Sequence, residues 1–224
     1  MKNFELLKKC PLFQKIEEKE LSAMLDCLNA RTLTLAKNET IFQEGSKATY
    51  VGLVLSGSVQ IVQDDFYGNR SIIAVIHPPQ LFAEAFACAN VELMPVSVIA
   101  ERPSEIMLID CKRILSTCTN TCIFHQQLIN NLLRIVASKN LLLQQKIEVM
   151  SQRTTRDKLM TYLLSQAKLK NNNEFTIPYD RQALADYLGV ERSALSAEIG
   201  KLRKEGVLES TKSHFRLLES EKLS

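Results

Sequence analysis

The sequence predicts an α+β protein with three parts: an antiparallel β-roll or jelly roll, a long central helix, and a winged helix-turn-helix. Three observations support this fold class. Short Val-, Ile- and Leu-rich runs fill residues 32–110, an apolar heptad pattern fills residues 123–150, and two short helical patterns precede a hairpin pattern. We therefore expect a first domain at residues 1–122, a central dimerisation helix at 123–150, and a carboxy-terminal domain at 151–224.

Length and composition indicate ordinary hydrophobic cores in two water-soluble domains. The chain has 224 residues, of which 46% are hydrophobic, and its apolar runs are too short and too often interrupted by charge to span a bilayer. The first residues lack the continuous apolar stretch of a signal peptide. We therefore expect a cytoplasmic protein that has no membrane partner.

Residues 32–110 carry the pattern of a roll. The expected strands cover residues 34–37, 50–55, 58–63, 71–76 and 96–100. Gly45, Gly57 and Gly68 lie between apolar runs, where hairpins or bends are expected. Many short strands at regular spacing are typical of an antiparallel roll. Residues 3–30, which precede this region, have a helical pattern with leucines and a methionine as apolar contacts.

The central helix carries two apolar stripes. One alternates spacings of four and three residues and consists of Ile129, Leu133, Val136, Asn140, Leu143, Ile147 and Met150. This is a heptad seam with one polar position, so we predict that the helix pairs with a second copy and that Asn140 fixes the register. A second stripe of Leu128, Leu132, Ile135 and Leu142 is expected to pack on the roll. The alternative is that both stripes are buried within one chain.

Residues 177–206 predict a helix-turn-helix. Asp180 is a suitable N-cap for the first helix, and Gly189 supplies the left-handed residue with which that helix ends. Leu195, Ile199 and Leu202 form the buried stripe of the second helix. The opposite face carries short side chains, and a hairpin pattern over residues 207–218 predicts a wing.

The outer face of the second helix predicts contact with double-stranded DNA. Arg192 at its tip suits a guanine edge, and Ser193 and Ser196 suit bases or phosphates. Lys201 and Lys204 are expected near backbone phosphates. Residues 151–224 hold 13 Lys and Arg against 10 Asp and Glu, which accounts for the whole net charge of +3. The alternative is a helical hairpin with a solvated basic face.

Together, the roll with its glycine bends, the long helix and the winged helix resemble the cyclic-AMP receptor protein / fumarate-nitrate regulator (Crp/Fnr) family of bacterial transcription regulators. The resemblance covers nearly the whole chain and is strongest in residues 50–58 and 180–206. It implies a cyclic-nucleotide-binding-like roll, a homodimer with paired central helices, and an effector that shifts the DNA-binding domains. It also implies RNA polymerase as a partner, and it assigns base contacts to Arg192, Ser193 and Ser196.

The resemblance also locates an effector pocket. Nucleotide-binding relatives hold the ribose and the cyclic phosphate with a Gly-Glu pair and an Arg-Ser pair, where this chain has Ala83-Glu84 and Met94-Pro95. Met94 and Pro95 supply neither a cation nor a hydroxyl for phosphate, so we expect that cyclic AMP is not the effector. Arg102 is the nearest alternative cation. The candidate pocket residues are Glu84, Met94, Pro95 and Asn140, of which Asn140 is assigned by its place on the central helix.

Six cysteines, at positions 10, 27, 88, 111, 118 and 122, suggest a second kind of sensing. Cys118, Cys122 and His125 form the tightest group, at the expected start of the central helix, where thiols can be acidified or can bind metal. Buried, inert thiols are the other interpretation. Iron–sulfur sensors of the family carry a tight amino-terminal cysteine cluster that this chain lacks. His77 and His125 stand alone, so neither an iron–sulfur nor a haem signature is present.

Enzymatic function is not expected. The sequence contains no P-loop, dinucleotide fingerprint or nucleophile elbow, and its three histidines offer little general-base chemistry. We therefore predict a homodimeric transcription regulator that binds a palindromic operator under the control of an unidentified effector. The alternative is an effector-binding module whose winged helix contacts proteins, which predicts no salt-dependent affinity for any duplex.

Overall fold

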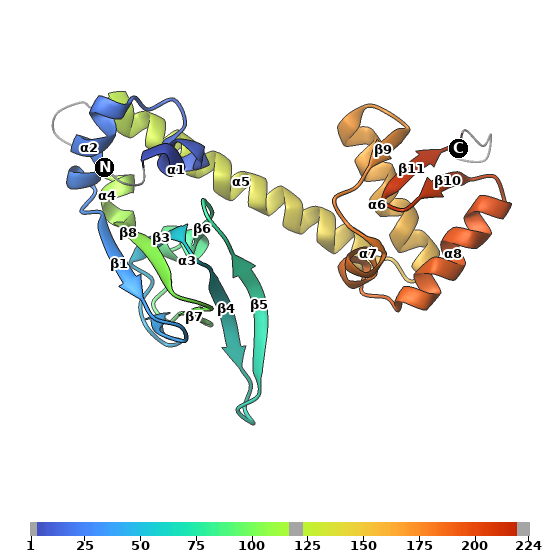
Figure 1. Cartoon of the computed structure of the whole chain (residues 1–224), viewed down its shortest axis with the longest axis horizontal. Coiled ribbons are helices and arrows are strands. Elements are labelled where there is room, and N and C mark those ends of the chain that lie inside the picture. Colours follow the sequence, from blue (N-terminus) through green and yellow to red (C-terminus); the bar gives the residue numbers. More distant parts are fainter. Residues whose placement is uncertain (1–3, 117–122, 219–224) are drawn as a thin grey trace. The chain divides into compact units, whose positions relative to one another are not determined.

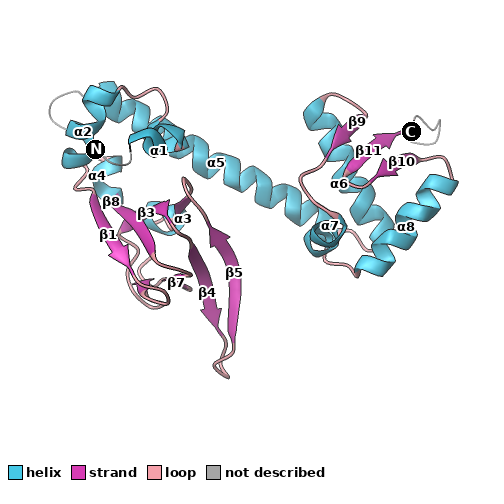
Figure 2. Cartoon of the chain, in the orientation of Figure 1, coloured by secondary structure: helices cyan, strands magenta, loops and turns pink. Residues whose placement is uncertain are grey.

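The computed structural model describes residues 4–116 and 123–218, and its contacts divide the chain into two compact units, Met1–Ser138 and Lys139–Ser224. Strands make up much of the first unit, whereas helices predominate in the second (Figures 1 and 2). The helix α5 (Ile123–Ser151) contributes its first half to the first unit and its second half to the other. Among the described helices, none has the length and apolar character that crossing a membrane requires.

The first unit is a two-sheet roll with short helices before, within and after it. Its helices are α1 (Phe4–Lys9), η1 (Pro11–Phe13), α2 (Glu18–Cys27), α3 (Glu84–Cys88) and α4 (Cys111–Leu115). Its strands are β1 (Arg31–Leu35), β2 (Thr40–Phe42), β3 (Tyr50–Ser56), β4 (Val59–Asp64), β5 (Arg70–Ile76), β6 (Leu81–Phe82), β7 (Ser97–Ala100) and β8 (Ser104–Asp110). They form two four-stranded antiparallel sheets, in the orders β1-β8-β3-β6 and β2-β7-β4-β5. The predicted roll is confirmed.

The start of α5 packs into the helical side of the first unit. Leu128 and Leu132 are fully buried with apolar residues of α1, α2 and β3, and Ile135 lies partly buried against them. This confirms the second apolar stripe for these three residues. Leu142 is 64% exposed, so its predicted packing on the roll is wrong. It lies in the part of α5 that belongs to the second unit.

A buried amide fixes α5 to the amino-terminal helices. The side-chain nitrogen of Asn131 donates to the carbonyl oxygens of Leu12, at 2.9 Å, and Gln14, at 2.8 Å. Its side-chain oxygen accepts a hydrogen bond of 2.8 Å from Gln127. Because Asn131 is only 4% exposed, water cannot readily replace these bonds.

Asn131→Ala is therefore expected to destabilise the protein by about 2 kcal/mol, because it leaves two carbonyl groups without their donor. Urea unfolding followed by circular dichroism measures this difference. Asn130→Ala is the matched control, since Asn130 occupies the preceding position of α5 with an exposed side chain. Equal stabilities of the two variants would show that the amide contacts contribute little.

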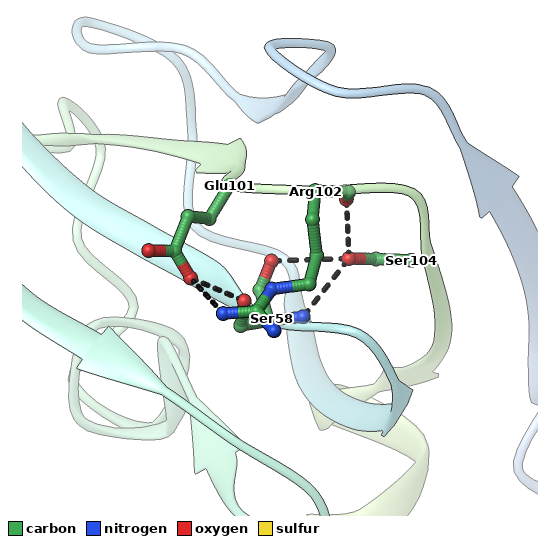
Figure 3. A network of polar contacts seen from close by, with 4 residues as sticks. All are labelled: Ser58, Glu101, Arg102 and Ser104. Carbon is green, nitrogen blue, oxygen red and sulfur yellow. Dashed lines mark hydrogen bonds and ion pairs between the residues drawn. The ribbon is translucent and has the colours of Figure 1, made fainter.

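The turn between β3 and β4 is closed by a polar network (Figure 3). The Ser104 hydroxyl accepts the backbone N–H of Ser58 at 3.0 Å and lies 2.7 Å from the Arg102 carbonyl oxygen, to which it can donate. The Ser58 hydroxyl donates to the Glu101 carboxylate, which the Arg102 guanidinium approaches to 3.1 Å. The hydrogen bond from Ser58 has the largest effect on Glu101, followed by that from Arg102. Together they hold the pKa of the Glu101 carboxyl below its ordinary value.

Gly57 is required at this turn for two reasons. Its φ of +78° is left-handed, and an added Cβ would lie 2.5 Å from the Pro103 carbonyl oxygen. Gly68 has a similar φ of +81° but open space around it. We expect Gly68→Ala to cost about 1 kcal/mol of stability and Gly57→Ala about 3 kcal/mol or more, because only Gly57→Ala adds a backbone clash. Thermal unfolding of both variants checks this difference, and a Gly57→Ala loss no larger than that of Gly68→Ala would contradict it.

The second unit is a winged helix-turn-helix. Its helices are α6 (Thr155–Lys170), α7 (Arg181–Leu188) and α8 (Arg192–Lys204), and its strands are β9 (Glu174–Thr176), β10 (Leu208–Thr211) and β11 (His214–Leu217). The strands form an antiparallel sheet in the order β10-β11-β9. The predicted helix pair and wing are confirmed, whereas α6 and the three-residue strand β9 were not singled out from the sequence.

The end of α5 is built into this second unit. Val149 is fully buried in its core, and the Lys146 ammonium donates to the Tyr187 carbonyl oxygen and lies 4.1 Å from the centre of the Tyr187 ring. Met150 fills the space beside Gly189, where an added Cβ would lie 2.8 Å from the Met150 methyl carbon. Burial, followed by the nearby charge of Lys158, lowers the pKa of Lys146.

Candidate nucleic-acid interface

Local sequence signals position the recognition helix α8. The Asp180 carboxylate accepts the backbone N–H of Ala183 at 2.8 Å and caps α7, as predicted. Gly189 ends α7 with a φ of +60°, which confirms the left-handed position. The predicted stripe on α8 is buried in the core of the unit and consists of Leu195, Ile199 and Leu202. Burial of this stripe determines which face of α8 remains outside.

The outer face of α8 is short and polar near its amino-terminal end. Arg192, Ser193, Ser196 and Ala197 are exposed, and Gly200 is half-buried. Small side chains allow a helix backbone to come close to a duplex, and an arginine at the tip can still reach a base edge. The structure thus brings the three predicted base-reading residues onto one exposed surface.

A hollow lined mainly by positively charged side chains lies beside this surface. It has a volume of about 430 Å³ and is lined by Asp180, Arg181, Gln182, Arg192, Lys212 and Ser213. Three of these residues are cations, and the one acid, Asp180, has a carboxylate oxygen engaged by the α7 cap. The hollow therefore favours an anionic group such as a phosphate.

Arg181 and Lys212 were not predicted from the sequence. The Arg181 guanidinium donates to the Lys212 carbonyl oxygen at 3.3 Å and lies 5.6 Å from the centre of the Phe215 ring, so it joins the start of α7 to the wing. Burial lowers the pKa of Arg181. Lys212 is exposed in the wing turn, with a φ of +52°. Its place in the middle of the predicted wing hairpin, residues 207–218, was the available signal, because wing turns lie beside the recognition helix.

The two lysines predicted at phosphates differ in their surroundings. The Lys201 ammonium lies 3.6 Å from the Glu198 carboxylate, which is also 3.6 Å from the Arg156 guanidinium. Arg156 pairs further with Glu205 at 2.6 Å. Both lysines are exposed, but Lys201 shares its acid with Arg156 of α6. Part of the Lys201 charge is therefore balanced within the protein.

The predicted effector residues occupy different environments. Met94 is only 2% exposed and belongs to the same apolar core as Ala83, so both predicted pocket segments contribute to one core of the roll. Glu84 is buried at the start of α3, after Ala83 in a left-handed conformation, and Pro95 is exposed. Arg102, the alternative cation, is paired with Glu101 in the turn network (Figure 3).

Asn140 is exposed and belongs to the second unit. On both sides of Asn140, most residues of the predicted heptad seam are exposed to solvent in the single chain. Ile129 and Val136 are half-buried, whereas Leu133, Leu143, Ile147 and Met150 are 65%, 62%, 67% and 42% exposed. Leu141 and Leu142 add two further exposed leucines, at 66% and 64%.

The predicted thiol group cannot be described as a unit, because Cys118 and Cys122 lie outside the described residues. His125 is buried, and its Nε2 lies 2.8 Å from the Ile114 carbonyl oxygen. That contact gives His125 a structural role at the start of α5. In the parts of the chain that the structure describes, no three His, Cys, Asp or Glu side chains are grouped to hold a metal ion.

Two family models match the chain. The cyclic nucleotide-binding domain matches residues 32–121, and the Crp-like helix-turn-helix domain matches residues 157–224. The chain is 24% identical over 201 residues to the transcriptional activator protein FnrA of Stutzerimonas stutzeri, which covers 88% of this chain and 80% of that protein.

Solved structures share the fold. The catabolite activator protein of Thermus thermophilus is similar with a TM-score of 0.53 and 20% identity, covering 93% of this chain and 94% of that one. DNR from Pseudomonas aeruginosa is similar with a TM-score of 0.50 and 22% identity, covering 98% and 95%. A cyclic nucleotide-binding-like roll and a Crp-like helix-turn-helix thus follow one another in a single chain, and the protein belongs to the Crp/Fnr family of transcription regulators.

Proposed function

We propose that this regulator acts as a cytoplasmic homodimer that reads a palindromic operator and works with RNA polymerase. In this proposal residues 1–122 sense an effector, residues 123–150 pair the two chains, and residues 151–224 bind DNA. The observation that carries the proposal is the exposed outer face of α8 beside a hollow lined by three cations. A short polar helix face flanked by cations suits the major groove and the phosphates at its edge.

The proposed DNA contacts are of two kinds: some recognise bases, and the others bind backbone phosphates. Arg192 sits at the tip of α8 and is proposed to read a guanine through its two-donor edge, with Ser193 and Ser196 beside it. Arg181 and Lys212 flank Arg192 in the hollow and are proposed to hold a backbone phosphate. Lys204, and Lys201 to a smaller extent, add general attraction.

Dimerisation is supported by the uncovered seam of α5. Burying a leucine or isoleucine contributes about 1.5–3 kcal/mol, so the exposed apolar residues of two paired helices offer enough free energy for association. The exposed Asn140 lies within this seam and is proposed to fix the register of the pair. A symmetric dimer presents two recognition helices to two half-sites.

The effector is proposed to act on the roll and to be a molecule other than cyclic AMP. The Met94 side chain fills the apolar core, and Pro95 has no N–H to offer a phosphate. Glu84 remains as a polar group of the pocket segment. Isothermal titration with cyclic AMP should therefore show no binding heat, and saturable binding would overturn this part of the proposal.

Operator selection tests the DNA-binding function. Duplexes that the protein enriches from a random pool should contain two inverted half-sites. The logarithm of the association constant for these duplexes should fall linearly with the logarithm of the salt concentration. A duplex with one half-site scrambled should bind much more weakly. Equal affinity for all duplexes, or no response to salt, would favour instead a winged helix that contacts proteins.

A further inference from the structure

Two cysteines that are distant in the sequence face each other in the roll unit. Cys88 is the last residue of α3, and Cys111 is the first residue of α4. Their sulfur atoms are 3.8 Å apart. Cys88 is half-buried and Cys111 is 2% exposed, so the pair lies at the boundary between core and solvent.

Cys111 is held firmly in place. Its backbone N–H donates to the Thr49 carbonyl oxygen at 3.1 Å, and the Asp110 carboxylate caps the following turn through the N–H of Lys112 at 2.9 Å. Cys88, in contrast, ends a helix of only five residues. A disulfide has a sulfur–sulfur bond of about 2.05 Å, so the two atoms must approach by about 1.8 Å for the bond to form.

The two thiols have unequal roles. Either thiol can donate in the contact between the two sulfur atoms, and the hydrogen bond with Cys111 lowers the pKa of Cys88 against the opposing effects of burial and of Glu84. The same contact and burial raise the pKa of Cys111. Cys88 is also the more exposed of the two, so it is the sulfur that an oxidant in solution meets first.

We propose that Cys88 and Cys111 form a redox-modification site, which closes to a reversible disulfide when the protein meets a peroxide. The Cys88 thiolate attacks one peroxide oxygen, the O–O bond breaks, and the departing hydroxide takes up a proton to become water. Cys88 is then a sulfenic acid. Cys111 gives up its proton, its sulfur attacks Cys88, and the S–O bond breaks with release of a second water. Two thiols are oxidised and one hydrogen peroxide is reduced.

The disulfide would join α3 to α4 inside the sensor roll. α3 begins with Glu84, the polar residue of the predicted effector pocket, so closure restrains that segment directly. Disulfides in a reducing cytosol are typically transient and regulatory, which fits a pair that is close but unjoined. The inference stands on the thiol geometry and is independent of the proposed DNA binding.

Peptide mapping of the full-length protein tests the site. The protein is treated with one to a few equivalents of hydrogen peroxide, free thiols are alkylated, and the chain is cleaved after Glu and after Lys or Arg. This cleavage places Cys88 in peptide 85–92 and Cys111 in peptide 106–112, with one cysteine in each. We expect a cross-linked species of these two peptides that dithiothreitol separates. A Cys88 that reaches sulfinic acid without a cross-link, or links mainly to other cysteines, would overturn the proposal.

Two variants separate this pair from the other thiols. In Cys111→Ser, Cys88 should persist as a sulfenic acid that dimedone captures, and the cross-linked species should vanish. Cys27→Ser removes an exposed cysteine elsewhere in the roll unit and should leave the yield of the cross-link unchanged. A large loss of yield in Cys27→Ser, or no dimedone capture in a folded Cys111→Ser protein, would contradict the mechanism.

Discussion

Replacing both Leu143 and Ile147 with glutamate is expected to convert the dimer into a monomer. Both side chains are largely exposed in the single chain and lie on the predicted seam of α5. Two paired chains bury four such side chains, each contributing about 1.5–3 kcal/mol, so their loss removes about 6 kcal/mol or more. That corresponds to a rise of about 10⁴-fold in the dimer dissociation constant, before any repulsion between the introduced carboxylates.

Sedimentation velocity measures this change, and operator affinity should fall with it because a monomer engages one half-site. Leu169→Glu is the control, since Leu169 is 73% exposed and lies on α6, not on the paired helix α5. It adds one negative charge per chain, against two in the test variant, and should leave the dimer intact. A Leu143→Glu/Ile147→Glu protein that sediments as a dimer would place the interface elsewhere.

Arg192→Ala is expected to abolish most of the preference for the operator while leaving the dimer intact. A two-donor arginine contact with guanine contributes about 1–3 kcal/mol of discrimination, and a symmetric dimer makes it twice. The expected loss is therefore about 2–6 kcal/mol, or roughly 30-fold to 10⁴-fold in the ratio of operator to random-duplex affinity. Because Arg192 is exposed, the substitution leaves the core of the unit untouched.

Fluorescence anisotropy with labelled operator and unlabelled competitors gives this ratio. Lys212→Ala is the informative comparison, because a phosphate contact should weaken all duplexes alike and reduce the slope against salt by about 1 per contact. If Arg192→Ala weakened all duplexes equally and Lys212→Ala altered sequence preference, the two proposed roles would have to be exchanged.

Features governed by neighbouring residues were predictable from the sequence. The Asp180 cap, the Gly189 stop and the leucine spacing of α8 depend on positions three or four apart, and all are confirmed. Five strands of the roll overlap the apolar runs expected from the sequence, whereas β2, β6, β8 and β9 were not among the expected strands. Three of the four have only two or three residues and are defined by their partner strands.

Features that need two distant segments to meet were not predictable. Arg181 and Lys212 share the hollow because the wing folds back onto α7, and they are 31 positions apart. Cys88 and Cys111 meet across 23 positions, whereas sequence spacing had drawn attention to Cys118 and Cys122. Likewise, the Glu198 that partly balances Lys201 also binds Arg156, a residue of the preceding helix. Each contact depends on tertiary packing, which periodicity does not encode.

The burial of Val149 and the contacts of Lys146 and Met150 give the end of α5 a second role. These residues anchor the last turns of α5 to α7 and to the core that supports α8. The end of the seam is therefore connected rigidly to the recognition helix. In the proposed dimer, the distance and angle between the two α5 helices at Ile147 would therefore set the distance between the two recognition helices. The number of base pairs between half-sites is then a property of the helix pair, and altering the packing at that end should change which operators fit.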